Sequence, residues 1–221
     1  MTFLPLVRVA DAGHDCAMPE NLTLPITEIV VFDGFDDLDA IAPLEILVAA
    51  GFPARVVRPA AHPSTVHSAH GLLLDVTDTL GDAPGLVIVP GGGWLDRGAG
   101  VRDQCEGPLP AAVAGLHEAG TVIASVCTGA MLLARAGLLT GRPAVTNRHA
   151  LDDLAAAGAD VRAQARVVDD GSVVTAGGPA AGIDLAIRLV TRFAGEEAGR
   201  AAAARLEYEP VGPVLVGVAA A

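Results

Sequence analysis

Cys127 lies where a reactive thiol would be expected, between an apolar run and a helical pattern. The run over residues 121–125 is typical of a buried strand, and residues 130–134 are typical of a helix. Ser125 and Gly129 place small residues two positions before and after the cysteine. This is the spacing of a nucleophile elbow, a sharp strand-to-helix turn that presents a nucleophile. Because the positive end of a helix favours thiolate over thiol, we predict a cysteine-dependent enzyme.

Two further cysteines and a group of histidines do not support a metal site. Cys16 lies in an irregular N-terminal segment and Cys105 in a polar loop, and free cysteines usually act as small hydrophobic residues. His62, His67 and His70 share one loop, but their spacing matches no known pattern of metal ligands. Without a C-x-x-C pair we also expect no disulfide framework, which favours a reducing, cytoplasmic location.

Composition argues against several classes of partner. The 221 residues suffice for one sizeable α/β domain, and the 52% hydrophobic content with only 3% aromatic residues predicts an aliphatic core. The net charge of −12, without a run of basic residues, argues against nucleic acid and anionic membranes as partners. No apolar stretch approaches the ~20 residues of a membrane span. Asp11 and His14 interrupt the apolar core that an export signal would need.

Strand and helix patterns alternate along one domain over residues 26–221, preceded by an extension over residues 1–25 that is partly disordered or lies on the domain. We predict strands at residues 29–32, 55–58, 72–75, 86–89, 121–125, 161–168 and 173–176. We predict helices at residues 39–50, 109–119, 129–136, 150–157 and 182–194. This alternation predicts an α/β fold with a mainly parallel sheet, covered by helices on both faces. Ligands of such sheets bind at the carboxyl ends of the strands.

A triple glycine follows one of the predicted strands at that edge. Consecutive glycines let backbone amides approach a developing negative charge, so Gly91, Gly92 and Gly93 could form an oxyanion hole beside Cys127. A flexible turn is the alternative, and the absence of a Gly-Lys-Ser/Thr or Gly-x-Gly-x-x-Gly pattern argues against phosphate binding. Trp94 comes next and either forms a wall of the substrate pocket or makes a surface or dimer contact.

An acidic segment precedes the first predicted helix. Asp36 and Asp37 suit a helix start, where carboxylates cap the chain and complement the dipole. Asp39 is followed by apolar residues and can face inward. A carboxyl group next to a thiolate is driven toward its protonated form and can donate a hydrogen bond to sulfur.

Several segments together resemble the DJ-1/PfpI superfamily, and most closely its isonitrile (isocyanide) hydratase-like branch, which overlaps the sensor domains of some AraC-type regulators. The resemblance extends in consistent order over residues 30–46, 89–92, 124–130, 136–142, 182–186 and 206–210. It implies a flavodoxin-like three-layer sandwich with a nucleophile elbow. It also implies a homodimer that acts on a small-molecule substrate without a cofactor.

The resemblance also implies roles for individual residues. Cys127 matches the nucleophile, Asp39 the acid that contacts its sulfur, and Thr128 the hydroxyl residue that follows the nucleophile. Gly92 and its neighbours match backbone donors that face the thiolate. In hydratase chemistry Cys127 would attack the terminal carbon of R–N≡C to form a thioimidate. Asp39 would supply a proton, and water would release an N-substituted formamide.

Three positions depart from the family pattern. Thr128 stands where protease-like members carry histidine, so we do not expect peptidase activity. Asn147 stands, about twenty residues after the nucleophile, where many members carry histidine, and His149 lies two residues further on. Pro179 removes a backbone N–H group next to Gly178. We expect Asn147 and Gly178 to line the substrate site.

Two other functions remain open. A glyoxalase- or deglycase-like activity on small α-oxoaldehydes would use the same thiolate, but Asn147 would weaken proton shuttling. A non-catalytic protein that senses a ligand or redox state is the other alternative, because a reactive thiol can oxidise to a sulfinate. No helix-turn-helix pattern follows Pro210, so we do not expect direct control of DNA.

Overall fold

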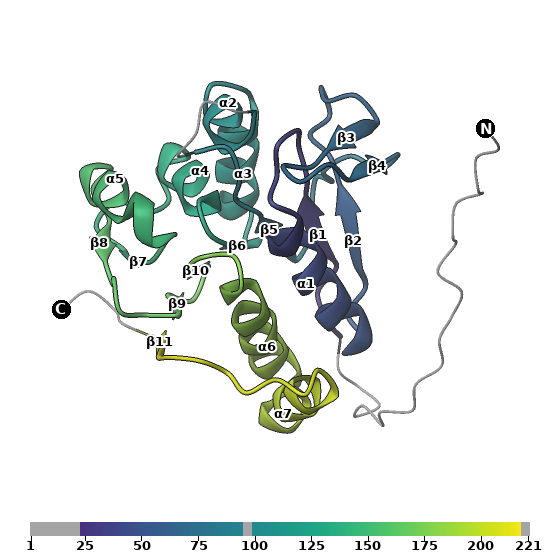
Figure 1. The fold of residues 1–221 in the computed structure, drawn as a ribbon, viewed down its shortest axis with the longest axis vertical. Coiled ribbons are helices and arrows are strands. Elements are labelled where there is room, and N and C mark those ends of the chain that lie inside the picture. The colour runs from purple at the N-terminus through teal and green to yellow at the C-terminus, as the bar shows by residue number, and fades with distance from the viewer. Residues whose placement is uncertain (1–22, 95–98, 218–221) are drawn as a thin grey trace.

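The computed structural model describes residues 23–94 and 99–217 and has the predicted three-layer α/β architecture (Figure 1). Almost all of the predicted N-terminal extension over residues 1–25, including Cys16, lies outside the described residues. No described helix is long and apolar enough to cross a membrane.

A seven-stranded sheet forms the central layer, in the order β11-β9-β10-β6-β5-β1-β2. Its strands are β1 (Thr27–Val30), β2 (Ala54–Val57), β5 (Leu86–Val89), β6 (Val122–Ser125), β9 (Val167–Asp169), β10 (Val173–Ala176) and β11 (Val214–Val216). The run from β2 to β10 is parallel, whereas β9 pairs antiparallel with β10. The carboxyl ends of β1, β5, β6 and β10 therefore meet at one edge of the sheet.

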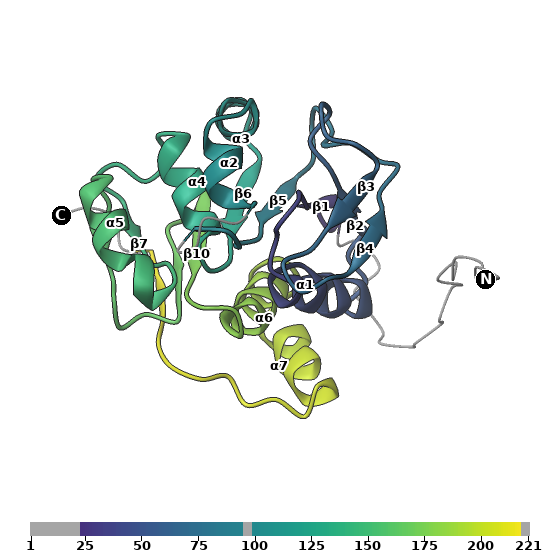
Figure 2. The same ribbon diagram turned by 45° about the horizontal axis from the view of Figure 1, so that its top comes forward.

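Helices cover both faces of this sheet (Figures 1 and 2). One face carries α1 (Asp37–Ala49), α6 (Ala181–Ala194) and α7 (Glu196–Arg205), and the other carries α2 (Val101–Cys105), α3 (Leu109–Glu118) and α4 (Gly129–Arg135). Beside α4 lie η1 (Arg148–Ala150), α5 (Leu151–Ala156) and a small sheet of β7 (Pro143–Ala144) and β8 (Asp160–Val161). A hairpin of β3 (Thr65–His67) and β4 (Leu73–Asp75) stands outside the main sheet.

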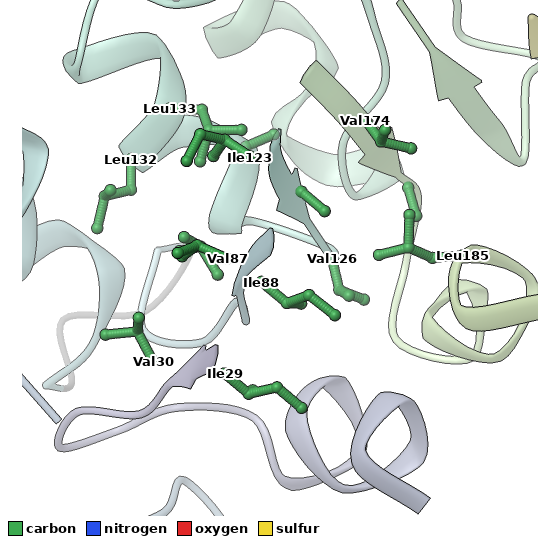
Figure 3. Packing of buried hydrophobic residues seen from close by; sticks show 14 of the residues in the cluster. Ile29, Val30, Val87, Ile88, Ile123, Val126, Leu132, Leu133, Val174 and Leu185 are labelled. Carbon is green, nitrogen blue, oxygen red and sulfur yellow. The ribbon is translucent and has the colours of Figure 1, made fainter. Parts of the chain in front are cut away.

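The core packs against both faces of the sheet because β5, in the middle of it, is apolar and buried at every position. Figure 3 shows Val87 pointing toward the side of α4, where Leu132 and Leu133 lie. The next residue, Ile88, points toward the opposite side, where α6 contributes Leu185. All five side chains are fully buried. Alternation of this kind explains why the strands read as continuous apolar runs.

The structure corrects several sequence predictions. The single strand expected over residues 161–168 is wrong, because a turn from Arg162 to Ala165 divides it into β8 and β9, which belong to different sheets. Cys105 does not lie in a loop but ends α2, and it is buried. The prediction also missed α2, α7 and the strands β3, β7 and β11. Apart from α7, these elements have two to five residues, too few to show a period.

A buried carboxylate fastens the C-terminal segment to the domain. Asp184, in the first turn of α6, accepts hydrogen bonds from Arg166 Nε at 2.6 Å, Tyr208 Oη at 3.0 Å and Val211 N at 3.1 Å. Two of the segments that carry the family resemblance, residues 182–186 and 206–210, meet in this cluster. Because every donor reaches the same carboxylate, Asp184 determines where the chain passes on its way to β11.

We predict that Asp184→Ala lowers the free energy of unfolding by about 3–5 kcal/mol, because it leaves the partly buried Arg166 guanidinium without its carboxylate. Chemical denaturation monitored by circular dichroism measures this loss. Asp160→Ala, which removes an exposed partner of Arg162, is the control and should cost less than about 1 kcal/mol. Equal losses in the two variants would contradict the assignment.

Candidate active site

Cys127 occupies the turn between β6 and α4 with a left-handed backbone, φ 56°. Such a conformation costs a residue with a side chain about 1–3 kcal/mol and persists only where neighbours impose it. The Cys127 N–H group donates to the carbonyls of Ala176 at 3.1 Å and Gly177 at 2.8 Å. Its own carbonyl accepts from Thr146 Oγ1 at 2.8 Å. Cys127 therefore has the backbone geometry that the elbow spacing predicted.

The residues that flank Cys127 are small because the turn leaves them no room. A methyl group added at Gly129 would overlap the Val89 carbonyl oxygen and lie 2.8 Å from the Pro90 carbonyl oxygen. Ser125 is completely buried in β6. A larger side chain at Gly129 would force the elbow away from the end of β5.

The glycine segment after β5 holds the two side chains expected beside the cysteine. Gly91 N donates to Asp39 Oδ2 at 2.8 Å, and Gly92 N donates to Thr128 Oγ1 at 3.0 Å. Asp39 is fully buried and Thr128 is nearly so. Two of the amides expected to form an oxyanion hole are thus engaged by protein acceptors, and their observed effect is to position these side chains. An oxyanion role for Gly93 stays a prediction.

One side-chain donor reaches the Cys127 sulfur, since Asn147 Nδ2 donates to Sγ at 3.2 Å. The Thr128 backbone amide and the Asp39 carboxyl group lie close enough to influence the pKa of the thiol. The Asp39 Oδ1 atom is buried and has no hydrogen-bond partner in the described part of the chain. The structure therefore brings together a thiol, a buried acid and a fixed N–H donor.

Burial disfavours the charged forms of both Cys127 and Asp39. It raises the pKa of the Cys127 thiol to about 12, and a negative charge on Asp39 would add to that shift, while the N–H donors act against it. Burial, with a smaller contribution from Asp36, also raises the pKa of Asp39 well above its usual range. The expectation that a helix end would favour the thiolate is wrong for the resting site. The helix α4 has only seven residues, and desolvation outweighs its effect.

Trp94 bridges two helices at one side of the site. Its Nε1 donates to Asp153 Oδ2 on α5 at 2.7 Å, and the Arg102 guanidinium of α2 lies over its ring, 4.7 Å from the centroid. The indole ring of Trp94 is thus held in place by Asp153 and Arg102 of the same chain. Gly178 lies next to the Asn147 side chain: a methyl group added at Gly178 would be 3.5 Å from Asn147 Nδ2.

The loop histidines pair with carboxylates. His67 Nδ1 lies 3.3 Å from Asp33 Oδ1, and His70 Nδ1 lies 2.7 Å from Asp37 Oδ2. Within residues 23–94 and 99–217, no group of three or more His, Cys, Asp or Glu side chains is arranged to hold a metal ion.

Sequence reasoning missed Thr146 and Asp153. Thr146 is buried and supports the elbow through its hydroxyl group, and its place next to Asn147 was the available signal. Asp153 could not be found in advance, because nothing in a helical pattern indicates a partner 59 residues away.

Comparisons with known proteins place these observations in a family. The model of the DJ-1/PfpI family matches residues 28–192. An isonitrile hydratase from Pseudomonas putida is 37% identical over 150 residues, which cover 67% of this chain and 63% of that protein, so the chain spans less than two thirds of its length. A Parkinson disease protein 7 homolog from Danio rerio is 26% identical over 174 residues, covering 76% of this chain and 89% of that protein.

Solved structures of similar fold agree with this match. A THiJ/PfpI family protein from Pseudomonas syringae superposes with a TM-score of 0.76 at 26% identity, covering 93% of this chain and 84% of that one. Drosophila melanogaster DJ-1beta gives a TM-score of 0.74 at 20% identity, covering 85% and 100%, and bears on the fold alone.

We predict that Gly91→Ala disrupts the site. The added methyl group would lie 2.7 Å from both the backbone nitrogen and Oγ1 of Thr128 and 2.8 Å from Asp39 Oδ2, so the side chains of both residues would have to move. The free energy of unfolding should fall by about 1–3 kcal/mol, as for other overpacked positions. Gly115→Ala in α3, where the new methyl group meets nothing within 4 Å, is the matched control and should be neutral or stabilising. Equal free energies of unfolding for the two variants would show that a methyl group at Gly91 does not displace Thr128 and Asp39.

We predict that Asp39→Asn is increasingly more stable than the wild type as pH rises toward neutrality. Because the folded-state pKa of Asp39 is raised, the native state binds its proton more tightly than the unfolded chain does. Wild-type stability therefore falls as pH rises above about 3.9, the ordinary pKa of aspartate, toward the raised value. Asparagine keeps an acceptor for Gly91 N without titrating. Urea unfolding between pH 4 and 8 measures the difference, with exposed Asp75→Asn as control. Parallel pH profiles for wild type and Asp39→Asn would exclude a raised pKa.

Proposed function

The chain belongs to the DJ-1/PfpI family, and we propose that it is a cysteine-dependent isonitrile hydratase that converts R–N≡C into an N-substituted formamide. The observation that carries this proposal is the buried pair of Cys127 and Asp39, a nucleophile and an acid whose pKa values are both raised by burial. The similarity to the Pseudomonas putida hydratase supports the choice of substrate class.

In the first step, the Cys127 sulfur bonds to the terminal carbon of the isonitrile while Asp39 gives that carbon a proton. The carboxylate then takes up the thiol proton, and the product is the thioimidate R–N=CH–S–Cys127. One proton has moved in total from sulfur to carbon. Burial suits this step, because the substrate is neutral and the thiolate need exist only as the carbon–sulfur bond forms.

In the second step, water adds to the thioimidate carbon and the substrate nitrogen takes up a proton. The carbon–sulfur bond then breaks, which releases R–NH–CHO and restores the thiol. Asp39 is placed to accept and return a proton at both stages, because Gly91 N holds Oδ2 while Oδ1 is left for the reacting groups. These steps involve only Cys127, Asp39, substrate and water.

The site fits the alternatives less well. Glyoxalase-like chemistry moves a proton between neighbouring carbons, and the amide of Asn147 at the sulfur cannot act as that base. A redox sensor needs an accessible thiol of low pKa, whereas Cys127 is only 5% exposed and its pKa is raised. By family resemblance we further propose a cytoplasmic homodimer that requires no cofactor.

We predict that the purified protein produces formamide from a simple alkyl isocyanide, measured by NMR. Cys127→Ala should abolish turnover, and Asp39→Asn should reduce it by about 10²–10⁴-fold, the usual contribution of a positioned general acid. Cys105→Ala, which alters a buried thiol on α2 away from the elbow, should retain activity. Turnover that survives in Cys127→Ala would refute the mechanism. No turnover by a folded wild type across several isocyanides would refute the substrate class.

A further inference from the structure

Asn147 is held in position by the chain on both sides of it. Val145 N donates to Thr175 Oγ1 of β10 at 3.0 Å, and Thr146 Oγ1 donates to the Cys127 carbonyl at 2.8 Å. Asn147 itself caps the start of η1, where its Oδ1 accepts from His149 N at 3.0 Å. Three consecutive residues are thus bound to β10, to the elbow and to the following helical turn.

These contacts determine which way the Asn147 amide faces. If the amide were turned over, its NH₂ group would face the His149 N–H group, donor against donor. With Oδ1 held by His149 N, Nδ2 must point the other way, and there it lies 3.2 Å from Cys127 Sγ. The sulfur therefore receives an N–H group that cannot ionise and cannot rotate away without the loss of a hydrogen bond.

We infer that Asn147 is a catalytic donor to the sulfur that stabilises developing negative charge on Cys127, both as the nucleophile and as the leaving group of the thioimidate. Charge on sulfur is greatest as the carbon–sulfur bond forms and as it breaks. A donor that is already in place gains most at those moments, because no reorganisation is needed. This role rests on the proposed function for the leaving-group step, but the donation to sulfur is independent of the substrate.

The alternative role for Asn147 is structural, as the cap of η1. Asparagine and aspartate are equally good caps, so Asn147→Asp keeps the acceptor for His149 N. The same substitution replaces the donor at sulfur with an oxygen atom. Asn147→Ala removes both. The two variants therefore separate the cap from the donor.

The experiment measures alkylation of Cys127 by iodoacetamide at pH 8, resolved by peptide mass spectrometry so that other thiols do not interfere. Donation to sulfur predicts that both variants react about ten- to a hundredfold more slowly than the wild type, with Asn147→Asp at least as slow as Asn147→Ala. Wild-type rates in Asn147→Asp would overturn the inference and leave only the cap. Thermal unfolding of each variant confirms that it is folded.

Isocyanide turnover supplies the second measurement. With a functioning wild type, both variants should accumulate Cys127 carrying the mass of one isocyanide, because the thioimidate breaks down slowly when its leaving group is less stabilised. Fast breakdown in both variants would overturn the leaving-group role. If the wild type does not act on isocyanides, slow alkylation of both variants still establishes the donor, so the failure of the proposed function and that of this inference are distinguishable.

Discussion

The left-handed backbone of Cys127 is the constraint on which the rest of the site depends. A residue with a side chain keeps this conformation only where its surroundings impose it. Here the carbonyls at the end of β10 and the hydroxyl group of Thr146 impose it through hydrogen bonds. The same turn brings Thr128 Oγ1 to Gly92 N. The glycine segment and the acceptors of the Cys127 amide come from the carboxyl ends of β5 and β10, the strands on either side of β6, so the parallel sheet itself stabilises the elbow.

Burial and electrostatics act against each other around this turn. Burial disfavours charge on both Cys127 and Asp39, whereas the donors Asn147 and Gly91 favour it. Burial prevails for the resting site and raises the pKa values of both groups. Such an arrangement suits chemistry in which charge appears only briefly, and it does not suit a thiol that must react with whatever reagent diffuses past.

Much of this arrangement was predictable from residue types and spacing. The small flanks of Cys127 predicted the elbow, and the alternation of apolar runs with helical patterns predicted a mainly parallel sheet, both of which the structure has. An inward-facing Asp39 followed from the apolar helix around it. These features are local in the sequence, or are repeated often enough to form a pattern.

The remainder depends on contacts between distant segments. Nothing near Gly91 indicates that its amide binds Asp39, 52 residues earlier, and nothing near Asn147 indicates which of its two side-chain atoms faces sulfur. The thiol's protonation was misjudged for the same reason, since a helix end is visible in sequence but the depth of burial is not. The edge strand β11 escaped notice because its three residues are largely exposed.

The hydrogen bonds of the Cys127 amide also link the state of the thiol to the completeness of the sheet. Their acceptors, Ala176 and Gly177, lie about fifty residues further along, in β10, which pairs with β6, and directly after it. A chain in which these segments are apart lacks both the hydrogen bonds that impose the left-handed backbone and the burial that raises the pKa of the thiol. Folding therefore lowers the reactivity of the Cys127 thiol toward reagents in bulk solvent, while it prepares the same thiol to react with a small substrate bound in the site.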